Sequence, residues 1–122
     1  MKTILVVDDE ANIRRLYAAE LAEDGYRVLT AASWAEAEAV LARETPDLVT
    51  LDIRMGEGPD GIEALRLIKE RHAALPVVLL TAYGEYRADF GSWAAEGYVV
   101  KSSDLTELRQ RIALLLGGGP AA

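Results

Sequence analysis

Five polar residues stand directly after short apolar segments, and each can bind a phosphate group or a metal ion. They are Asp8, Asp9, Asp52, Thr81 and Lys101. Apolar runs rich in Val, Ile and Leu are typical of parallel strands that are buried on both faces. Ligands of such sheets bind beyond the carboxyl ends of the strands. The spacing therefore predicts one small, strongly charged site with carboxylates, a hydroxyl and an ammonium group.

The three carboxylates indicate a site for a divalent cation. Asp8 and Asp9 follow the first predicted strand and Asp52 follows the third, and these strands are neighbours in a doubly wound sheet of order 2-1-3-4-5. Like charges at short range repel strongly, and a bound cation would remove that repulsion. Mg²⁺ suits oxygen ligands, with Mn²⁺ as an alternative, whereas zinc is disfavoured without nearby His or Cys.

A carboxylate held against Mg²⁺ can act as a nucleophile on phosphorus and form an aspartyl phosphate. The hydroxyl of Thr81 can donate to one phosphoryl oxygen, and the ammonium of Lys101 can neutralise another. Such electrostatic stabilisation is what phosphoryl transfer mainly requires. The five residues therefore predict phosphate chemistry without a nucleotide-binding loop.

The chain alternates strand-like and helix-like segments, as expected for a parallel sheet with right-handed crossovers. The predicted strands lie near residues 3–7, 27–31, 47–51, 76–81 and 97–101. Helices are predicted over 11–24, between the capping box that opens at Ser33 and Pro46, around Ile62 to Ile68, and from Asp104 to the glycines at Gly117. A further helix between 83 and 96 contains two glycines and is expected to be short or irregular.

These segments predict an α/β domain over residues 1–116, with helices on both faces of a five-stranded parallel sheet, and a flexible tail over 117–122. The length of 122 residues and the 51% of hydrophobic residues are typical of one globular domain. The net charge of −7 disfavours direct binding to nucleic acid. The absence of cysteine fits a reducing compartment, so the cytoplasm is expected. The first apolar run is too short for a signal peptide or a membrane span.

The order of the motifs resembles the receiver domains of two-component response regulators across residues 2–116. Four segments carry the resemblance: Val6-Val7-Asp8-Asp9-Glu10, Leu51-Asp52-Ile53-Arg54-Met55, Leu80-Thr81-Ala82 and Gly97-Tyr98-Val99-Val100-Lys101. They are similar in turn to the family's acidic pair, phosphorylation segment, switch hydroxyl, and switch aromatic followed by a lysine. The resemblance implies a flavodoxin-like fold and, unless the chain is truncated, a stand-alone domain similar to chemotaxis regulators.

By resemblance, Asp52 accepts a phosphoryl group from a histidine kinase or phosphotransfer protein, or from a small donor such as acetyl phosphate. Asp9, Asp52 and the main-chain carbonyl of Arg54 would ligate Mg²⁺, and Asp8 would act through water. The chain would catalyse phosphoryl transfer only to its own aspartate, and it is not expected to be an enzyme.

The resemblance also implies how the signal leaves the domain. Thr81 and Lys101 would contact the phosphoryl oxygens, and Tyr98 would swing inward when Thr81 moves. A face built by the fourth helix, the fifth strand and the last helix would then bind or release an unidentified downstream protein. We expect a monomer or a weak dimer.

The loops around the site depart from the family pattern. Ser102 stands where the family usually has Pro after the lysine, and a cis bond before a non-proline residue costs about 2.5–4 kcal/mol. We therefore expect a trans bond between Lys101 and Ser102. The loop over 55–61 looks longer than usual, and the segment from Thr81 to Lys101 looks shorter, which predicts an unusual signalling face.

Bulky and aromatic side chains near these loops support two further hypotheses. Arg54 and Tyr83 flank the route of the hydrolytic water in the family, and their bulk predicts a long-lived phosphoryl group. Tyr86, Phe90 and Trp93 lie in the glycine-weakened helix, and aromatic residues are enriched at binding hot spots. We expect these three residues to form a face for a dedicated protein partner.

Other functions remain open on the same fold. A pseudo-receiver would keep the fold and bind proteins without phosphorylation, and Ser102 and the altered loop over 55–61 keep this alternative in place. A flavin carrier is disfavoured because no Ser/Thr/Gly-rich phosphate loop follows the first strand. A phosphatase with an aspartate nucleophile is disfavoured because the segment after Asp52 lacks a second aspartate that could act as acid and base.

Overall fold

The computed structural model describes residues 1–54, 61–81, 95–102 and 104–117. Several sequence predictions fall outside these residues and stay predictions. They concern the fourth helix, most of the loop over 55–61, the side chain of Tyr83, the partner face of Tyr86, Phe90 and Trp93, and the tail beyond Gly117.

Five parallel strands form one sheet in the predicted order β2-β1-β3-β4-β5. The strands are β1 Thr3–Val7, β2 Arg27–Ala31, β3 Leu48–Asp52, β4 Val77–Thr81 and β5 Gly97–Val100. β3 and β4 are buried throughout and β1 nearly so, whereas β2 lies at one edge and is partly exposed. This burial on both faces explains why the three central strands have continuous apolar sequences.

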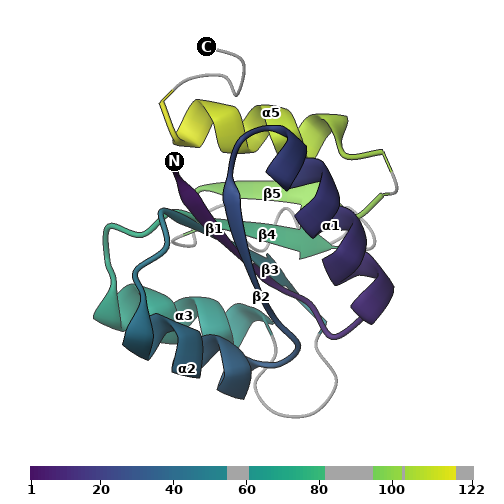
Figure 1. Cartoon of the computed structure of the whole chain (residues 1–122). Coiled ribbons are helices and arrows are strands. Elements are labelled where there is room, and N and C mark those ends of the chain that lie inside the picture. Colours follow the sequence, from purple (N-terminus) through teal and green to yellow (C-terminus); the bar gives the residue numbers. More distant parts are fainter. Residues whose placement is uncertain (55–60, 82–94, 103, 118–122) are drawn as a thin grey trace.

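Helices cover both faces of the sheet, as Figure 1 shows. The helices of the described residues are α1 Ala11–Glu23, α2 Trp34–Arg43, α3 Gly61–Arg71 and α5 Thr106–Leu115. α1 and α5 lie on one face, and α2 and α3 lie on the other. The longest of these helices has 13 residues, so none of the described helices could span a lipid bilayer. The arrangement is the predicted doubly wound, flavodoxin-like fold.

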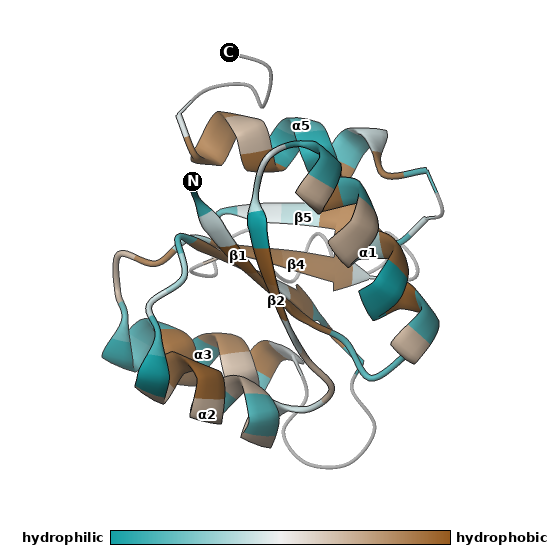
Figure 2. Cartoon of the chain, in the orientation of Figure 1, coloured by the Kyte–Doolittle hydropathy of each residue, from teal (hydrophilic) through white to brown (hydrophobic). Residues whose placement is uncertain are grey.

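The sheet separates two apolar cores, and β4, one of its central strands, is mostly hydrophobic in Figure 2. Leu5 packs with Leu65 of α3 on one side of the sheet. Ile4 packs with Tyr17 of α1 and Ile112 of α5 on the other side. Neighbouring residues of β1 therefore enter different cores, as the two-residue period of a strand requires. Full burial of each large apolar side chain stabilises the fold by roughly 1.5–3 kcal/mol.

Three strands, β3, β4 and β5, begin or end one residue away from the predicted positions, and main-chain hydrogen bonding explains the shifts of β3 and β4. Pro76 has no N–H group to donate, and β4 begins at Val77 instead. β3 includes Asp52 because this residue is paired with Leu80 of β4. The ladder continues beyond it, since the N–H of Ile53 donates to the carbonyl of Leu80 over 2.9 Å.

Local sequence signals begin α2 and end α1 as predicted. The Ser33 hydroxyl accepts a hydrogen bond from the N–H of Glu36, and the Glu36 carboxylate accepts one from the N–H of Ala32. This reciprocal pattern is a capping box at the start of α2. α1 ends at Glu23, and Gly25 follows with a φ of 92°, a left-handed conformation that glycine adopts without strain.

An ion pair at the amino-terminal edge of the sheet ties α3 to the start of β5. Lys69 Nζ lies 2.9 and 2.8 Å from the carboxylate oxygens of Glu96 and donates to the Leu75 carbonyl over 2.7 Å. Glu96 also accepts the N–H of Val77 over 2.8 Å. The Lys69 side chain is only 12% exposed, so these contacts are largely shielded from solvent. They hold the chain at Glu96, two residues before Tyr98.

Gly61 allows α3 to approach the segment that carries Asp52. Its N–H donates to the Ile53 carbonyl over 2.8 Å. A Cβ atom at this position would lie 2.5 Å from the Asp52 carbonyl oxygen and 2.6 Å from Ile53 Cα. Both are main-chain atoms, so they cannot move without displacing the end of β3. Glycine at the first position of α3 is therefore a requirement of close packing.

We expect Gly61→Ala to reduce the free energy of unfolding by roughly 1–3 kcal/mol, the usual penalty for overpacking. Helix propensity alone predicts the opposite sign, because alanine within a helix is about 0.5–1 kcal/mol more favourable than glycine. Urea unfolding of the two proteins distinguishes these outcomes. A more stable alanine variant would show that α3 does not need its close approach to β3.

Candidate functional site

The register of β1 and β3 brings Asp8 and Asp52 to the same edge of the sheet. Val7 is paired with Leu51, so the two aspartates that follow them lie side by side at the carboxyl ends of neighbouring strands. Asp8 is fully buried and Asp52 is 5% exposed. The fold therefore holds two carboxylates close together where water screens their repulsion poorly.

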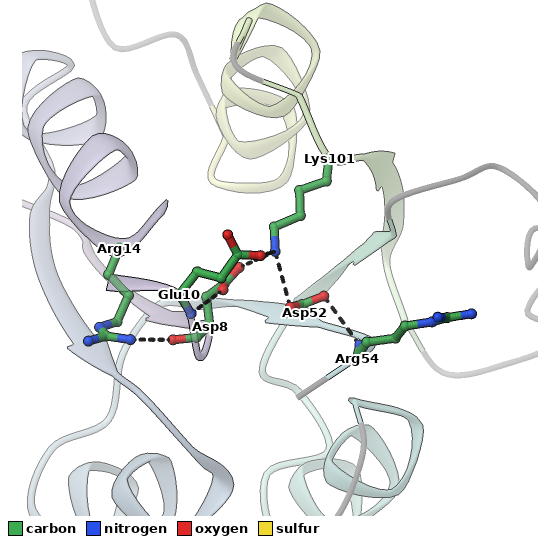
Figure 3. Close-up of polar contacts among 6 residues, drawn as sticks. All are labelled: Asp8, Glu10, Arg14, Asp52, Arg54 and Lys101. Carbon is green, nitrogen blue, oxygen red and sulfur yellow. Dashed lines mark hydrogen bonds and ion pairs between the residues drawn. The ribbon is translucent and has the colours of Figure 1, made fainter. Parts of the chain in front are cut away.

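The ammonium of Lys101 lies between these two carboxylates (Figure 3). Its Nζ atom is 2.8 Å from Asp8 Oδ2 and 3.1 Å from Asp52 Oδ2, and Glu10 Oε1 lies 3.5 Å away. The end of β5 positions the lysine, since its N–H donates to the Thr81 carbonyl over 2.6 Å. The lysine side chain is 13% exposed, so these ion pairs are largely shielded from solvent.

The polar groups of Asp8 make four different contacts. Its N–H donates to the Ala31 carbonyl over 3.0 Å, and its carbonyl accepts from Arg14 Nη1 over 2.8 Å. Its Oδ1 atom accepts the N–H of Glu10 over 2.9 Å. Its buried Oδ2 atom has no partner with hydrogen-bond geometry, and the adjacent Lys101 ammonium balances its charge. Asp8 is therefore fixed in position before any ligand arrives.

Asp52 directs its two carboxylate oxygens to different neighbours. Oδ1 accepts the N–H of Arg54 over 3.2 Å, and Oδ2 accepts from Lys101 over 3.1 Å. The guanidinium of Arg54 points away from the carboxylate in Figure 3, so Asp52 contacts the main chain of this residue. The roles of Arg54 as a carbonyl ligand and as a regulator of hydrolysis stay predictions.

Burial and charge act together on the pKa values of the site. Burial and the neighbouring Asp8 raise the pKa of Asp52 above that of an ordinary aspartate, and this outweighs the opposite effect of Lys101. Burial alone would lower the pKa of Lys101, but the contacts with Asp8 and Asp52 outweigh it and raise the pKa above its usual value. Lys101 is therefore a cation at neutral pH, whereas ionisation of Asp52 is less favourable than that of an ordinary aspartate.

Thr81 and Tyr98 occupy β4 and β5 beside this cluster. Thr81 is the last residue of β4 and is 4% exposed. Tyr98 is paired with Leu79, two residues before Thr81, and packs against the core that contains Leu79. Side chains of Thr81 and Tyr98 therefore project from the same face of the sheet. The switch roles of both residues stay predictions.

The peptide bond after the lysine has the expected isomer. The bond between Lys101 and Ser102 is trans, and no peptide bond within the described residues is cis. Ser102 Oγ accepts the N–H of Asp104 over 3.0 Å, and the Asp104 carboxylate accepts the N–H of Thr106 over 3.0 Å. These short-range hydrogen bonds lead the chain from β5 into α5.

The donor set fits a divalent cation that prefers oxygen. One carboxylate oxygen from each of Asp8, Asp9 and Glu10 lies within 4.8 Å of the others. Asp52 lies close to this group, since it shares the Lys101 ammonium with Asp8. These donors are all carboxylate oxygens, which suit Mg²⁺ or Mn²⁺.

Two residues at the site were not singled out from the sequence. Glu10 adds a third consecutive carboxylate and contacts Lys101. Arg14 donates to the main chain of Asp8. Both had a signal in the sequence, since an acidic residue extends the predicted pair and an arginine stands one helical turn after it.

The fold and the site match one protein family. The response regulator receiver domain matches residues 4–113, and the chain belongs to this family. The response regulator TrrA of Thermotoga maritima, solved in complex with Mg²⁺ and BeF, has 46% identity and a TM-score of 0.88. That match covers 94% of this chain and 99% of the TrrA chain.

Two further matches are a solved complex with a kinase and a longer regulatory protein. A solved complex of the histidine kinase ThkA with TrrA matches at 46% identity and a TM-score of 0.87, over 96% of this chain and 100% of the matched chain. The phosphate regulon regulatory protein PhoB of Pseudomonas aeruginosa is 39% identical over 98% of this chain and 54% of PhoB. The chain thus spans about half the length of this curated relative.

The raised pKa of Asp52 predicts that stability depends on pH. Between the ordinary pKa of aspartate and the raised value, the native protein binds more protons at this residue than the unfolded chain does, so stability falls as the pH rises through this window. In the presence of a metal chelator, Asp52→Asn should therefore melt at a higher temperature than wild type at pH 7. This advantage should disappear below about pH 3, where both side chains are neutral.

Asp104→Asn is the matched control, because hydrogen bonds from Thr106 lower the pKa of Asp104 and its ionised form is favoured in the native state. This variant should be no more stable than wild type at pH 7. Thermal melts of the three proteins across pH provide the measurement. An Asp52→Asn protein that melts below wild type at pH 7 would contradict this account. It would show that Lys101 lowers the pKa of Asp52 more than burial and Asp8 raise it.

Proposed function

We propose that the chain is a phosphoacceptor receiver in which Asp52 takes a phosphoryl group in a Mg²⁺-dependent reaction. The observation that carries the proposal is the contact of one shielded ammonium, Lys101, with both Asp8 and Asp52 at the carboxyl edge of the sheet. A carboxylate nucleophile beside a fixed positive charge suits phosphoryl transfer, which depends mainly on positioning and electrostatics. The solved TrrA structure with Mg²⁺ and BeF supports the choice of metal.

In the proposed reaction, an oxygen of the Asp52 carboxylate attacks phosphorus. The bond between phosphorus and the donor breaks, and its electron pair leaves with the imidazole nitrogen of a phosphohistidine or with the acetate of acetyl phosphate. Lys101 stays protonated and exchanges its contact with Asp52 for one with a phosphoryl oxygen, while the Thr81 hydroxyl donates to another. The protein thus transfers the group only to its own aspartate.

The acidic residues have a separate part in this proposal. Asp9, Asp52 and the carbonyl of Arg54 hold Mg²⁺ or Mn²⁺, and Asp8 acts through water. The bound ion supplies positive charge that offsets the phosphoryl oxygens. The group of carboxylate oxygens at Asp8, Asp9 and Glu10 supports this assignment.

The proposed signal is a change in protein contacts. Phosphorylation adds roughly −1.5 to −2 charges at Asp52, which draws Thr81 and then Tyr98 inward and changes the face that a downstream protein binds. The complex of ThkA with TrrA supports a histidine kinase as the partner that supplies the phosphoryl group. The net charge of −7 supports a protein partner in place of nucleic acid. We place this signalling in the cytoplasm, with the chain as a monomer or weak dimer.

The intact mass after incubation with acetyl phosphate and Mg²⁺ tests the proposed function. Wild type should gain the mass of one phosphoryl group, whereas Asp52→Asn and a wild-type sample with a chelator should gain none. Asp47→Asn is a matched control, because this aspartate lies at the opposite edge of the sheet, where it accepts the N–H of Thr3. It should accept the group as wild type does.

A wild type that gains no mass should next be incubated with phosphorylated histidine kinases, since some receivers do not react with small donors. Continued failure would contradict the proposal and favour a pseudo-receiver that binds its partners without phosphorylation. Phosphorylation of the Asp52→Asn protein would show that another residue is the acceptor.

A further inference from the structure

Arg14 connects α1 to the turn that carries the acidic residues. Its Nη1 atom donates to the main-chain carbonyl of Asp8 over 2.8 Å, and its own N–H donates to the Glu10 carbonyl over 3.1 Å. Figure 3 shows the guanidinium reaching from α1 toward Asp8. The main chain of α1 therefore holds the Glu10 end of the turn, and the Arg14 side chain holds the Asp8 end.

Asp9 lies in the middle of this turn, between two peptide groups whose orientation is fixed. The carbonyl of Asp8 is oriented by Arg14, and the N–H of Glu10 is held by Asp8 Oδ1 over 2.9 Å. Asp9 itself is exposed, so packing contributes little to its position. Arg14 thus fixes the first of the two peptide groups that flank Asp9.

We infer that Arg14 is a positioning residue for the divalent cation, which it serves by holding the Asp8–Asp9 peptide so that the Asp9 carboxylate faces the site. The inference rests on the proposed function, because it assumes that Asp9 binds the metal. Residues that orient metal ligands in this way usually change metal affinity by about 10–100-fold when they are replaced.

The competing explanation is that Arg14 contributes only its charge. A guanidinium near three carboxylates repels a divalent cation, so its removal would then tighten Mg²⁺ binding. Positioning predicts weaker binding and charge alone predicts stronger binding. The sign of the change therefore separates the two explanations.

The experiment measures Mg²⁺ binding to the unphosphorylated protein by isothermal titration calorimetry. Arg14→Met removes the donor and the charge while keeping most of the apolar stem. Arg15→Met is the matched control, because it removes the same charge from the neighbouring, exposed residue of α1. Arg14→Lys keeps the charge and one donor group, and it serves as the conservative variant. Amide spectra of the metal-free proteins report whether each variant is folded and whether the signals of Asp9 and Glu10 move.

We expect Arg14→Met to raise the Kd for Mg²⁺ about tenfold and to shift the amide signals of Asp9 and Glu10 in the absence of metal. Arg15→Met should bind at least as tightly as wild type, and Arg14→Lys should recover most of the affinity. An Arg14→Met protein that binds Mg²⁺ as tightly as Arg15→Met would overturn the inference and leave the proposed function intact. A wild type that binds no Mg²⁺ would overturn both.

Discussion

Repulsion between Asp8 and Asp52 is the constraint on which the rest of the site depends. The pairing of Val7 with Leu51 forces these carboxylates together at the end of two buried strands, and burial raises the pKa of Asp52. One ammonium group offsets this repulsion. The end of β5 places Lys101 Nζ within 3.1 Å of a carboxylate oxygen of each aspartate. A single positive charge for several carboxylates leaves the site with an excess of negative charge, which favours a divalent cation.

The surrounding contacts hold this arrangement in place before any phosphoryl group arrives. Gly61 lets α3 pack directly against the main chain at Asp52. Arg14 donates a hydrogen bond that holds the carbonyl of Asp8. At the far edge of the sheet, the pair of Lys69 and Glu96 fixes the start of β5. Preorganised charges of this kind need little rearrangement during phosphoryl transfer, which is why they stabilise a transition state better than water does.

The fold and most of the site could be predicted from the sequence because their signals are local. Continuous apolar runs located the strands, and the polar residue after each run located the edge where Asp8, Asp52 and Lys101 meet. Contacts that depend on the angle between elements could not be predicted, such as the approach of α3 that requires Gly61. Helix propensity alone favours alanine at position 61, since propensity takes no account of the close contact with β3.

The stability of Lys101→Met with and without Mg²⁺, compared with wild type, tests the charge balance most directly. Without metal, the variant leaves two buried carboxylates without their cation, and we expect a loss of roughly 3–5 kcal/mol in the free energy of unfolding. Saturating Mg²⁺ should stabilise the variant more than wild type, because the ion then supplies the missing positive charge. Equal stabilisation of the two proteins, or a metal-free variant as stable as wild type, would contradict the role of Lys101 in balancing Asp8 and Asp52.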